Sequence, residues 1–487
     1  MKKRTAGIFV LFLLLYGLLL QSRFYGDGVL YLGLARAGKV YAHHHLYLPL
    51  LVPFERLLGF LGIGDRFAGF FFSAFCVSLG LAVLWGGLRS PAERSERTAS
   101  QAEALLLLGL VATAPALVFF GTTAEVHALH FAFVCLCLRA IEHAQQRGTS
   151  SAWLLAGLAL MAVPASHLTG FLLLPYLCLY AASDGGKRCW PSPLLQRPSR
   201  LLFLLLPFLL YAWLMHLSLW FRQDVLQLSP ELLSDPIAFQ MKVSSAYDAS
   251  LAQRMSYLLE NGFYAAFGLV LVFFLGWGVL FWRSFAKACL LGMLLLPCVY
   301  FFSGQPISER GAYFLGLYPI FAFAIRDSRI LMHKAMRWLV LVLLIAQAGY
   351  AGIALREYPA HAREKPWIFV EDARTLLSQQ QGAHVTLICE SLWRAEEARF
   401  ELEGRVDAFH FPRIVQQLAT GLDVYLAVFL QRDLPAQLAK GPVYLTGRLK
   451  AALPQLWPDL LPALGKRYRL VPKKIRGTLF LRVEARD

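Results

Sequence analysis

The stretch from residue 23 to residue 53 concentrates side chains that can transfer protons and bind anions. It holds one acid, two cations and three consecutive histidines: Asp27, Arg36, Lys39, His43, His44 and His45. Asp27 stands between two glycines, which let the backbone bend sharply and approach a ligand closely. A partly desolvated carboxylate that a ligand can still reach suits a general base acting on a hydroxyl group. Asp27 could instead cap a helix over residues 29–37, which is a purely structural role.

The cations and imidazoles that follow Asp27 suit a phosphate group. Arg36 and Lys39 can form charge-assisted hydrogen bonds to phosphate oxygens and stabilise a phosphate leaving group. Both residues could equally contact lipid headgroups. The three histidines could also bind a divalent metal ion together with Asp27. Consecutive spacing makes a poor metal cage, however, so we expect neither a metal nor another cofactor.

Three further groups of polar residues stand at the ends of apolar runs. They are Glu125, His127 and His130, then Ser166, His167 and Thr169, and finally Glu309 and Arg310. An acid at the edge of a membrane span is costly unless it is paired or functional, so Glu125 is a second candidate for catalysis. A histidine in such a turn can also be an ordinary packing residue, and Glu309 and Arg310 can pair with each other.

The rest of the chain is strongly apolar. Hydrophobic residues make up 57% of the 487 residues and charged residues only 16%, with a mean hydropathy of +0.52. Charged residues reach about a quarter in soluble domains. Repeated apolar runs of roughly 15–22 residues predict a polytopic helical membrane protein. The net charge of +16 does not indicate nucleic-acid binding, because the cations are spread over many short loops.

We predict eleven membrane spans, with the N-terminus in the cytoplasm. They lie at about 6–20, 67–88, 103–121, 127–141, 152–166, 170–182, 201–220, 263–282, 288–302, 312–325 and 338–354. No cleavage site follows the first run, so we expect it to remain as an anchor. The cytoplasmic loops of this arrangement carry roughly twice as many Lys and Arg residues as the external loops, as expected for a protein of the inner (plasma) membrane. Asp27, Glu125, His167 and Arg310 then share the extracytoplasmic side.

Residues 355–487 differ in pattern from the membrane part at 1–354, whose first external loop covers 23–66. Apolar runs of strand length alternate here with helical patterns. The expected strands are His384–Cys389, Val424–Leu430, Val443–Leu445, Tyr468–Val471 and Thr478–Val483, and the expected helices are Glu396–Glu403 and Leu434–Lys440. The predicted fold class is therefore an all-α polytopic membrane bundle followed by a small extracytoplasmic α/β domain.

Several motifs together resemble the GT-C superfamily of multi-span glycosyltransferases, which use polyprenyl-phosphate-linked sugars. They are G-D-G-x-x-Y with the following H-x-L-Y-x-P, then A-E-V-H-A-L-H-F-A-F, S-H-L-T-G-F-L-L-L-P and E-R-G-A-Y-F-L-G-L-Y-P. The likeness is greatest to the bacterial multi-pass branch related to the transmembrane protein O-mannosyltransferases. It implies that Asp27 activates the acceptor, that Glu125 and His167 shape the pocket, and that the donor lipid phosphate binds near Arg310 in an inverting reaction.

The sequence therefore predicts a membrane enzyme that moves mannose or a similar hexose from a polyprenyl-phosphate donor to a hydroxyl group of a protein, lipid or glycan. Asp27 and Glu125 are the predicted catalytic residues. The predicted phosphate ligands are Arg310, Arg36 and Lys39, and the predicted pocket residues are His43, His44, His45, His127, His167 and Glu309.

Two other functions remain open. A transporter or flippase of a lipid-linked or anionic solute should place ionisable groups near mid-bilayer, often within inverted repeats, whereas the groups named above gather at one interface. A non-catalytic assembly factor would tolerate loss of the interface acids.

Overall fold

The computed structural model describes most of the chain as two compact units. The described residues are 2–21, 28–36, 44–89, 101–182, 198–217, 250–303, 311–361, 366–380, 384–389, 392–402, 405–410, 431, 434–456, 460–476 and 478–486. The first unit is a helical bundle that runs to residue 358, and the second combines the rest of the chain with residues 25–38 of the first predicted loop. The predicted division at residue 354 lies close to the boundary between the units, but the grouping of residues 28–36 with the second unit was not expected from the sequence.

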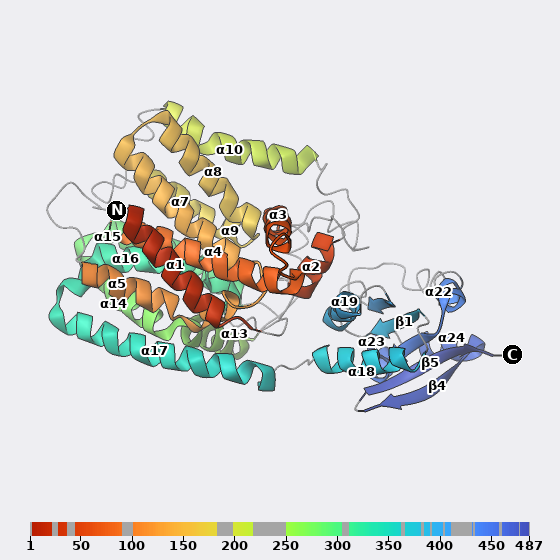
Figure 1. Ribbon diagram of the computed structural model, residues 1–487. Coiled ribbons are helices and arrows are strands. Elements are labelled where there is room, and N and C mark those ends of the chain that lie inside the picture. Colours follow the sequence, from red (N-terminus) through yellow and green to blue (C-terminus); the bar gives the residue numbers. More distant parts are fainter. Residues whose placement is uncertain are drawn as a thin grey trace. The chain divides into compact units, whose positions relative to one another are not determined.

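The described part of the first unit is a bundle of helices (Figure 1). They are α1 (Lys2–Leu18), α3 (Tyr47–Gly59), α4 (Asp65–Leu88), α5 (Gln101–Ala112), α6 (Pro115–Phe120), α7 (His127–Arg147), α8 (Ser150–Ser166), α9 (Gly170–Ala182), α10 (Pro198–Leu217), α13 (Leu251–Tyr257), α14 (Phe267–Arg283), α15 (Phe285–Ser303), α16 (Leu317–Ser328) and α17 (Lys334–His361). A π-helical turn, Leu258–Phe263, and a 3-10 turn, Tyr264–Ala266, connect α13 to α14. Helices cover all the predicted apolar runs, with ends shifted by a few residues, and the run at 103–121 is divided between α5 and α6.

Four helices within the described residues are long and apolar enough to cross a membrane. They are Arg66–Leu88, Leu251–Arg283, Phe285–Ser303 and Lys334–Leu355. The apolar helices at 101–112, 150–166, 170–182 and 198–211 are shorter. The number of eleven spans therefore stays a prediction.

A break between α5 and α6 interrupts the third predicted apolar run. The helix restarts at Pro115, because proline lacks an N–H group and disfavours helical backbone at the residue before it. The buried side chain of Gln347, in α17, donates to the Leu110 carbonyl near the end of α5 (2.7 Å). Its oxygen accepts from the N–H groups of Gly268 (2.9 Å) and Leu269 (3.3 Å), in the first turn of α14. One side chain thus satisfies the ends of two helices.

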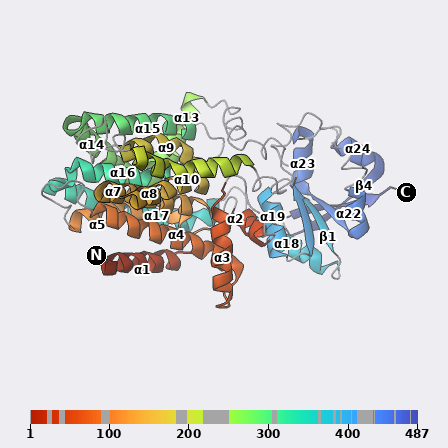
Figure 2. The same cartoon turned by 90° about the horizontal axis from the view of Figure 1, so that it is seen from above.

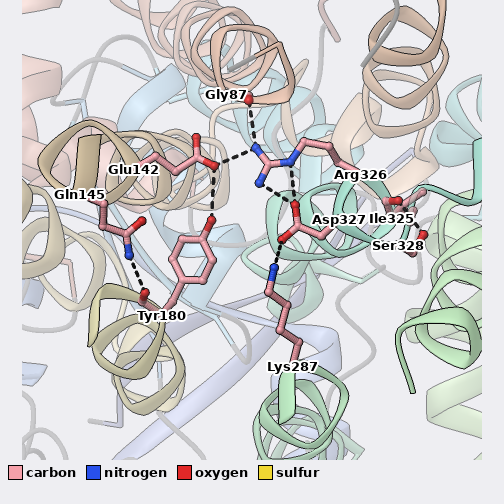
Figure 3. Close-up of polar contacts among 9 residues, drawn as sticks. All are labelled: Gly87, Glu142, Gln145, Tyr180, Lys287, Ile325, Arg326, Asp327 and Ser328. Atoms are coloured by element: carbon pink, nitrogen blue, oxygen red, sulfur yellow. Dashed lines mark hydrogen bonds and ion pairs between the residues drawn. The ribbon is translucent and has the colours of Figure 1, made fainter. Parts of the chain in front are cut away.

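A cluster of four charges, Glu142, Lys287, Arg326 and Asp327, joins α7, α15 and α16 (Figure 3), and all but the half-buried Lys287 have side chains exposed by 10% or less. The Arg326 guanidinium donates to Glu142 Oε1 (2.7 Å), to Asp327 Oδ1 (2.8 Å) and to the Gly87 carbonyl of α4 (3.0 Å). Lys287 Nζ donates to Asp327 Oδ2 at 3.0 Å. We call this group the ion cluster. Each carboxylate in it faces a cation, which compensates for the cost of burying the charges.

The second unit is built around a five-stranded sheet. Its strands are β1 (Val385–Cys389), β2 (Val406–His410), β3 (Val443–Thr446), β4 (Tyr468–Ile475) and β5 (Thr478–Ala485), in the order β2-β1-β3-β5-β4. β1 runs parallel to β2 and β3, whereas β5 is antiparallel to β3 and β4. The helices are α2 (Gly28–Arg36), α18 (Pro366–Ser378), α19 (Leu392–Glu401), α22 (Leu434–Lys440), α23 (Gly447–Leu456) and α24 (Leu460–Arg467).

The sheet separates two hydrophobic cores. One core joins α18 and α19 to one face through residues such as Leu376, Leu387 and Phe480, and the other joins α22, α23 and α24 to the opposite face. Figure 2 shows α18 and α19 together on one side of the sheet. Four predicted strands correspond to β1, β3, β4 and β5, and β2 was missed. The strand predicted at Val424–Leu430 lies outside the described residues.

Candidate active site

The predicted site residues divide into those that the structure describes and those that it does not. Asp27, Lys39, His43, Glu309 and Arg310 lie outside the described residues, and Arg36 is described only as the last backbone position of α2. Glu125, His44, His45, His127 and His167 are all described and buried. The structure therefore describes most of the predicted pocket residues but not the predicted base, Asp27.

His167 is the centre of a cluster of rings. It follows α8, with extended backbone (φ −159°) that turns the chain toward α9. Its ring centroid lies 4.8 Å from those of His44 and His127, 5.6 Å from that of His130 and 6.0 Å from that of Tyr313. These five residues, which we call the histidine cluster, come from four separate parts of the sequence.

Local hydrogen bonds determine which nitrogen of His167 carries the proton. The backbone N–H of Thr169 donates to His167 Nδ1 at 3.2 Å, and the Thr169 hydroxyl lies 2.8 Å from the same atom. An Nδ1 atom that accepts a backbone N–H cannot carry a proton itself. The neutral ring is therefore protonated on Nε2, so His167 can offer an N–H donor within the cluster.

His130 has the opposite tautomer. The Ser166 hydroxyl donates its only proton to the Val163 carbonyl (2.7 Å), so its oxygen accepts from His130 Nδ1 (3.0 Å). Nε2 of the neutral His130 ring is then an acceptor. It lies against Gly316 at the start of α16, where a Cβ atom would come within 2.8 Å of it. A glycine is thus needed for this close contact between α7 and α16.

The other members anchor the cluster to its surroundings. His44 is tilted by 31° against His167, and the neighbouring His45 has its Nδ1 2.6 Å from the hydroxyl of Tyr211 in α10. Tyr313 is half-buried and stacks on Phe302 of α15, with centroids 5.8 Å apart. Adjacent histidines thus take different roles, with His44 inside the cluster and His45 bound to α10.

Glu125 is held at the start of α7. Its backbone N–H donates to the Ser73 hydroxyl (3.3 Å), which lies 3.2 Å from the Glu125 carbonyl. Its side-chain Oε2 accepts from the backbone N–H of Val126 at 3.1 Å. A carboxylate at this position interacts favourably with the helix dipole of α7. Burial raises the pKa of Tyr47 well above its ordinary value, and the charge of Glu125 raises it further, so Tyr47 stays a neutral donor.

The backbone that follows Arg310 is fixed by the π-helical turn before α14. Gly311 has a left-handed conformation (φ 84°), and its N–H donates to Asn261 Oδ1 at 3.2 Å. A Cβ atom at Gly311 would lie 2.5 Å from Ala265 Cβ, so no other residue fits without movement. Asn261 is buried and also donates to the Tyr257 carbonyl (3.2 Å). Such π-helical turns are frequent at functional sites.

Comparison with solved structures shows the same architecture over nearly the whole chain. ArnT from Cupriavidus metallidurans bound to undecaprenyl phosphate matches with a TM-score of 0.64 and 12% identity, covering 98% of this chain and 97% of that one. Its apo form matches with a TM-score of 0.62 and 13% identity, covering 98% and 97%. Archaeal oligosaccharyltransferase AglB from Archaeoglobus fulgidus, in complex with an inhibitory peptide and a dolichol-phosphate, matches with a TM-score of 0.52 and 12% identity. The match covers 99% of this chain and 74% of that one.

These neighbours have the architecture of the superfamily that the sequence motifs resemble. The chain has the GT-C fold. No protein-family model matches the sequence, and no curated protein matches it significantly. The resemblance to the O-mannosyltransferase branch within the GT-C superfamily stays a prediction, since identities of 12–13% establish the fold alone.

Sequence reasoning found part of the cluster in this GT-C chain and missed part of it. His44, His127 and His167 were predicted and lie together, whereas His45 is turned toward Tyr211. Tyr313 was missed, although it stands three residues after Arg310 in a quoted motif. Within the described residues, no three His, Cys, Asp or Glu side chains are arranged to hold a metal ion.

Proposed function

We propose that this protein is an inverting glycosyltransferase of the membrane, which moves a hexose such as mannose from a polyprenyl-phosphate carrier to an acceptor hydroxyl on the extracytoplasmic face. The observation that carries the proposal is the histidine cluster. Three predicted pocket residues from distant stretches, His44, His127 and His167, meet there in a chain with the GT-C fold.

The neighbours support a lipid-linked donor. The ArnT structure holds undecaprenyl phosphate and the AglB structure holds a dolichol-phosphate, and both ligands are long isoprenoid chains that end in a phosphate. In our proposal, Arg310, Arg36 and Lys39 bind the corresponding phosphate. Arginine suits this role because its planar guanidinium can bind two phosphate oxygens at once. Gly311, directly after Arg310, has a left-handed backbone and is held by its hydrogen bond to Asn261.

The proposed reaction is a single displacement at the anomeric carbon. The acceptor oxygen attacks this carbon while Asp27 accepts the proton of the hydroxyl group. The bond between the anomeric carbon and the phosphate oxygen breaks, and its electron pair leaves with the polyprenyl phosphate. The phosphate is a stable anion, so it needs cations more than a general acid. Attack from the face opposite to the leaving group inverts the configuration of the anomeric carbon.

The described residues can supply recognition of the sugar. Ring faces and a few fixed polar atoms are the usual lining of a small-molecule site. The histidine cluster offers imidazole and phenol rings, with an Nε2–H donor on His167. Glu125, whose backbone is held by Ser73 and whose Oε2 accepts from the Val126 N–H, adds a carboxylate that can orient the acceptor and is the alternative base to Asp27.

The test is transfer by the purified protein from a radiolabelled polyprenyl-phosphate hexose to candidate acceptors. Asp27→Asn keeps the size and most of the capping ability of the side chain but removes its basicity. A general base contributes about 10²–10⁴-fold, so we expect transfer to fall by that factor while folding and donor binding are retained.

Near-normal transfer by folded Asp27→Asn would show that Asp27 is only a helix cap, and Glu125→Gln would then be the matched variant to measure. Movement of the labelled lipid across a vesicle membrane without any transfer to an acceptor would instead favour a flippase.

A further inference from the structure

The second unit includes a helix from the first predicted loop. α2 follows directly after Asp27 in the sequence and ends at Arg36, yet it groups with residues 359–487 and packs against α19. Figures 1 and 2 both show α2 beside α19. A short segment of the loop that is predicted to carry the base is therefore attached to a helix from the far end of the chain.

α2 depends on its packing partners. It has nine residues, including Gly28 and Gly33, whereas an isolated helix in water needs about 12–15 residues even with a favourable composition. Most of its side chains are buried, at exposures between 1% and 8%: Val29, Tyr31, Leu32, Leu34 and Ala35. The contact with α19 is thus part of what keeps this segment helical.

α19 is buried on two faces. Ala398, on α19, and Leu402, the residue after the helix ends, belong to the core beneath the sheet. Glu397 and Phe400 are also buried, at 2% and 7%, but they are not members of that core. With 3.6 residues per turn, residue 400 lies on a face well separated from that of residue 398. A second face of α19 therefore packs on something other than the sheet.

We propose that this second face of α19, with Glu397 and Phe400, holds α2 and thereby fixes the segment that begins directly after Asp27 in the sequence and ends at Arg36. The inference rests on the proposed function, in which these residues act on the acceptor and on the donor phosphate. Glu397 and Phe400 are positioning residues that work through α2.

The test combines hydrogen exchange with transfer kinetics on the full-length protein in lipid nanodiscs. Phe400→Ala truncates the large apolar side chain on the second face, and Leu402→Ala is the matched control because it removes apolar atoms from the core directly after the end of α19. We expect Phe400→Ala to raise the exchange rates of the α2 amides at least tenfold while β1 and β3 stay protected. A small misplacement of reacting groups can lower the transfer rate by about 10²-fold.

Leu402→Ala should act on the sheet amides and leave transfer closer to that of the wild type. If Phe400→Ala prevents folding, Leu32→Ala removes the contact from the α2 side and should give the same pattern. Unchanged exchange rates of the α2 amides in the folded variants would overturn the inference. So would the same exchange pattern and transfer rate in Phe400→Ala and Leu402→Ala. The exchange measurement does not depend on the reaction, so it stands even if Asp27→Asn refutes the proposed base.

Discussion

Removing Arg326 from the ion cluster should destabilise the bundle without affecting the chemistry. Its side chain is only 5% exposed and its closest contact is with Glu142 Oε1 at 2.7 Å. Breaking a buried ion pair by removing one partner usually costs about 3–5 kcal/mol. In Arg326→Met, Glu142 would keep Arg139 at 3.5 Å and Asp327 would keep Lys287 at 3.0 Å. Neither carboxylate is left without a cation, so we expect the unfolding free energy to fall by the lower end of this range, about 3 kcal/mol.

The measurement is thermal unfolding in mild detergent, with Arg147→Met as the control. Arg147 is an exposed cation in the last turn of α7, and its loss should change the unfolding free energy by no more than about 0.5 kcal/mol. Fifteen residues separate His127 from Glu142 along α7, which is about 22 Å at 1.5 Å per residue. Donor binding and transfer per folded molecule should therefore be unchanged at low temperature.

Two outcomes would contradict this reasoning. The first is a loss of less than about 1 kcal/mol, because it would mean that the buried contacts of Arg326 contribute little beyond those of an exposed cation. The second is a loss of transfer in molecules that remain folded, because it would connect the ion cluster to the reaction. A double-mutant cycle with Glu142→Met isolates the interaction between Arg326 and Glu142 from those of their neighbours. It should give an interaction energy of about 0.5–3 kcal/mol.

Three further predictions concern the histidine cluster and the topology. His167→Phe keeps a ring but removes the Nδ1 acceptor of the Thr169 N–H and the Nε2–H donor; we expect a folded protein whose transfer rate, measured with labelled donor, falls by at least tenfold. Gly316→Ala places a Cβ 2.8 Å from His130 Nε2 and should lower the unfolding free energy by about 1–3 kcal/mol, whereas Gly349→Ala in α17, with nothing within 4 Å, should be neutral or stabilising in the same assay. A cysteine at Arg469, which is 70% exposed, should react with a membrane-impermeant thiol reagent in intact cells, and labelling only after lysis would refute an external C-terminal domain.

The sequence predicts the elements well, because each depends on local pattern. Long apolar runs predict the helices of the bundle, and alternation between apolar and turn residues predicts most of the sheet. β2 was missed because Asp407 interrupts its short apolar pattern, and its strand conformation depends on pairing with β1. The broken helix at Pro115 had a local signal in the proline itself, although it was read as a continuous span.

Contacts between distant residues are less accessible from the sequence. His127 and His167 could be predicted because a polar residue in a turn between two apolar runs is conspicuous. Glu142 and Arg326 stand at helix ends among many other charges, and nothing local indicates that they pair across 184 residues. The attachment of α2 to α19 is hidden for the same reason, since a nine-residue apolar helix after a membrane span suggests contact with the membrane part.

Gln347 has a consequence for how the protein assembles during synthesis. The apolar interior of a membrane offers no water to satisfy backbone groups, so the Leu110 carbonyl and the Gly268 N–H need a partner. That partner is in α17, which is made after both α5 and α14. Chains fold from the N-terminus as they are synthesised, so these polar groups of α5 and α14 stay unpaired until α17 has been synthesised and inserted. A chain that ends before residue 347 should therefore be unstable in the membrane and a substrate for quality-control proteases.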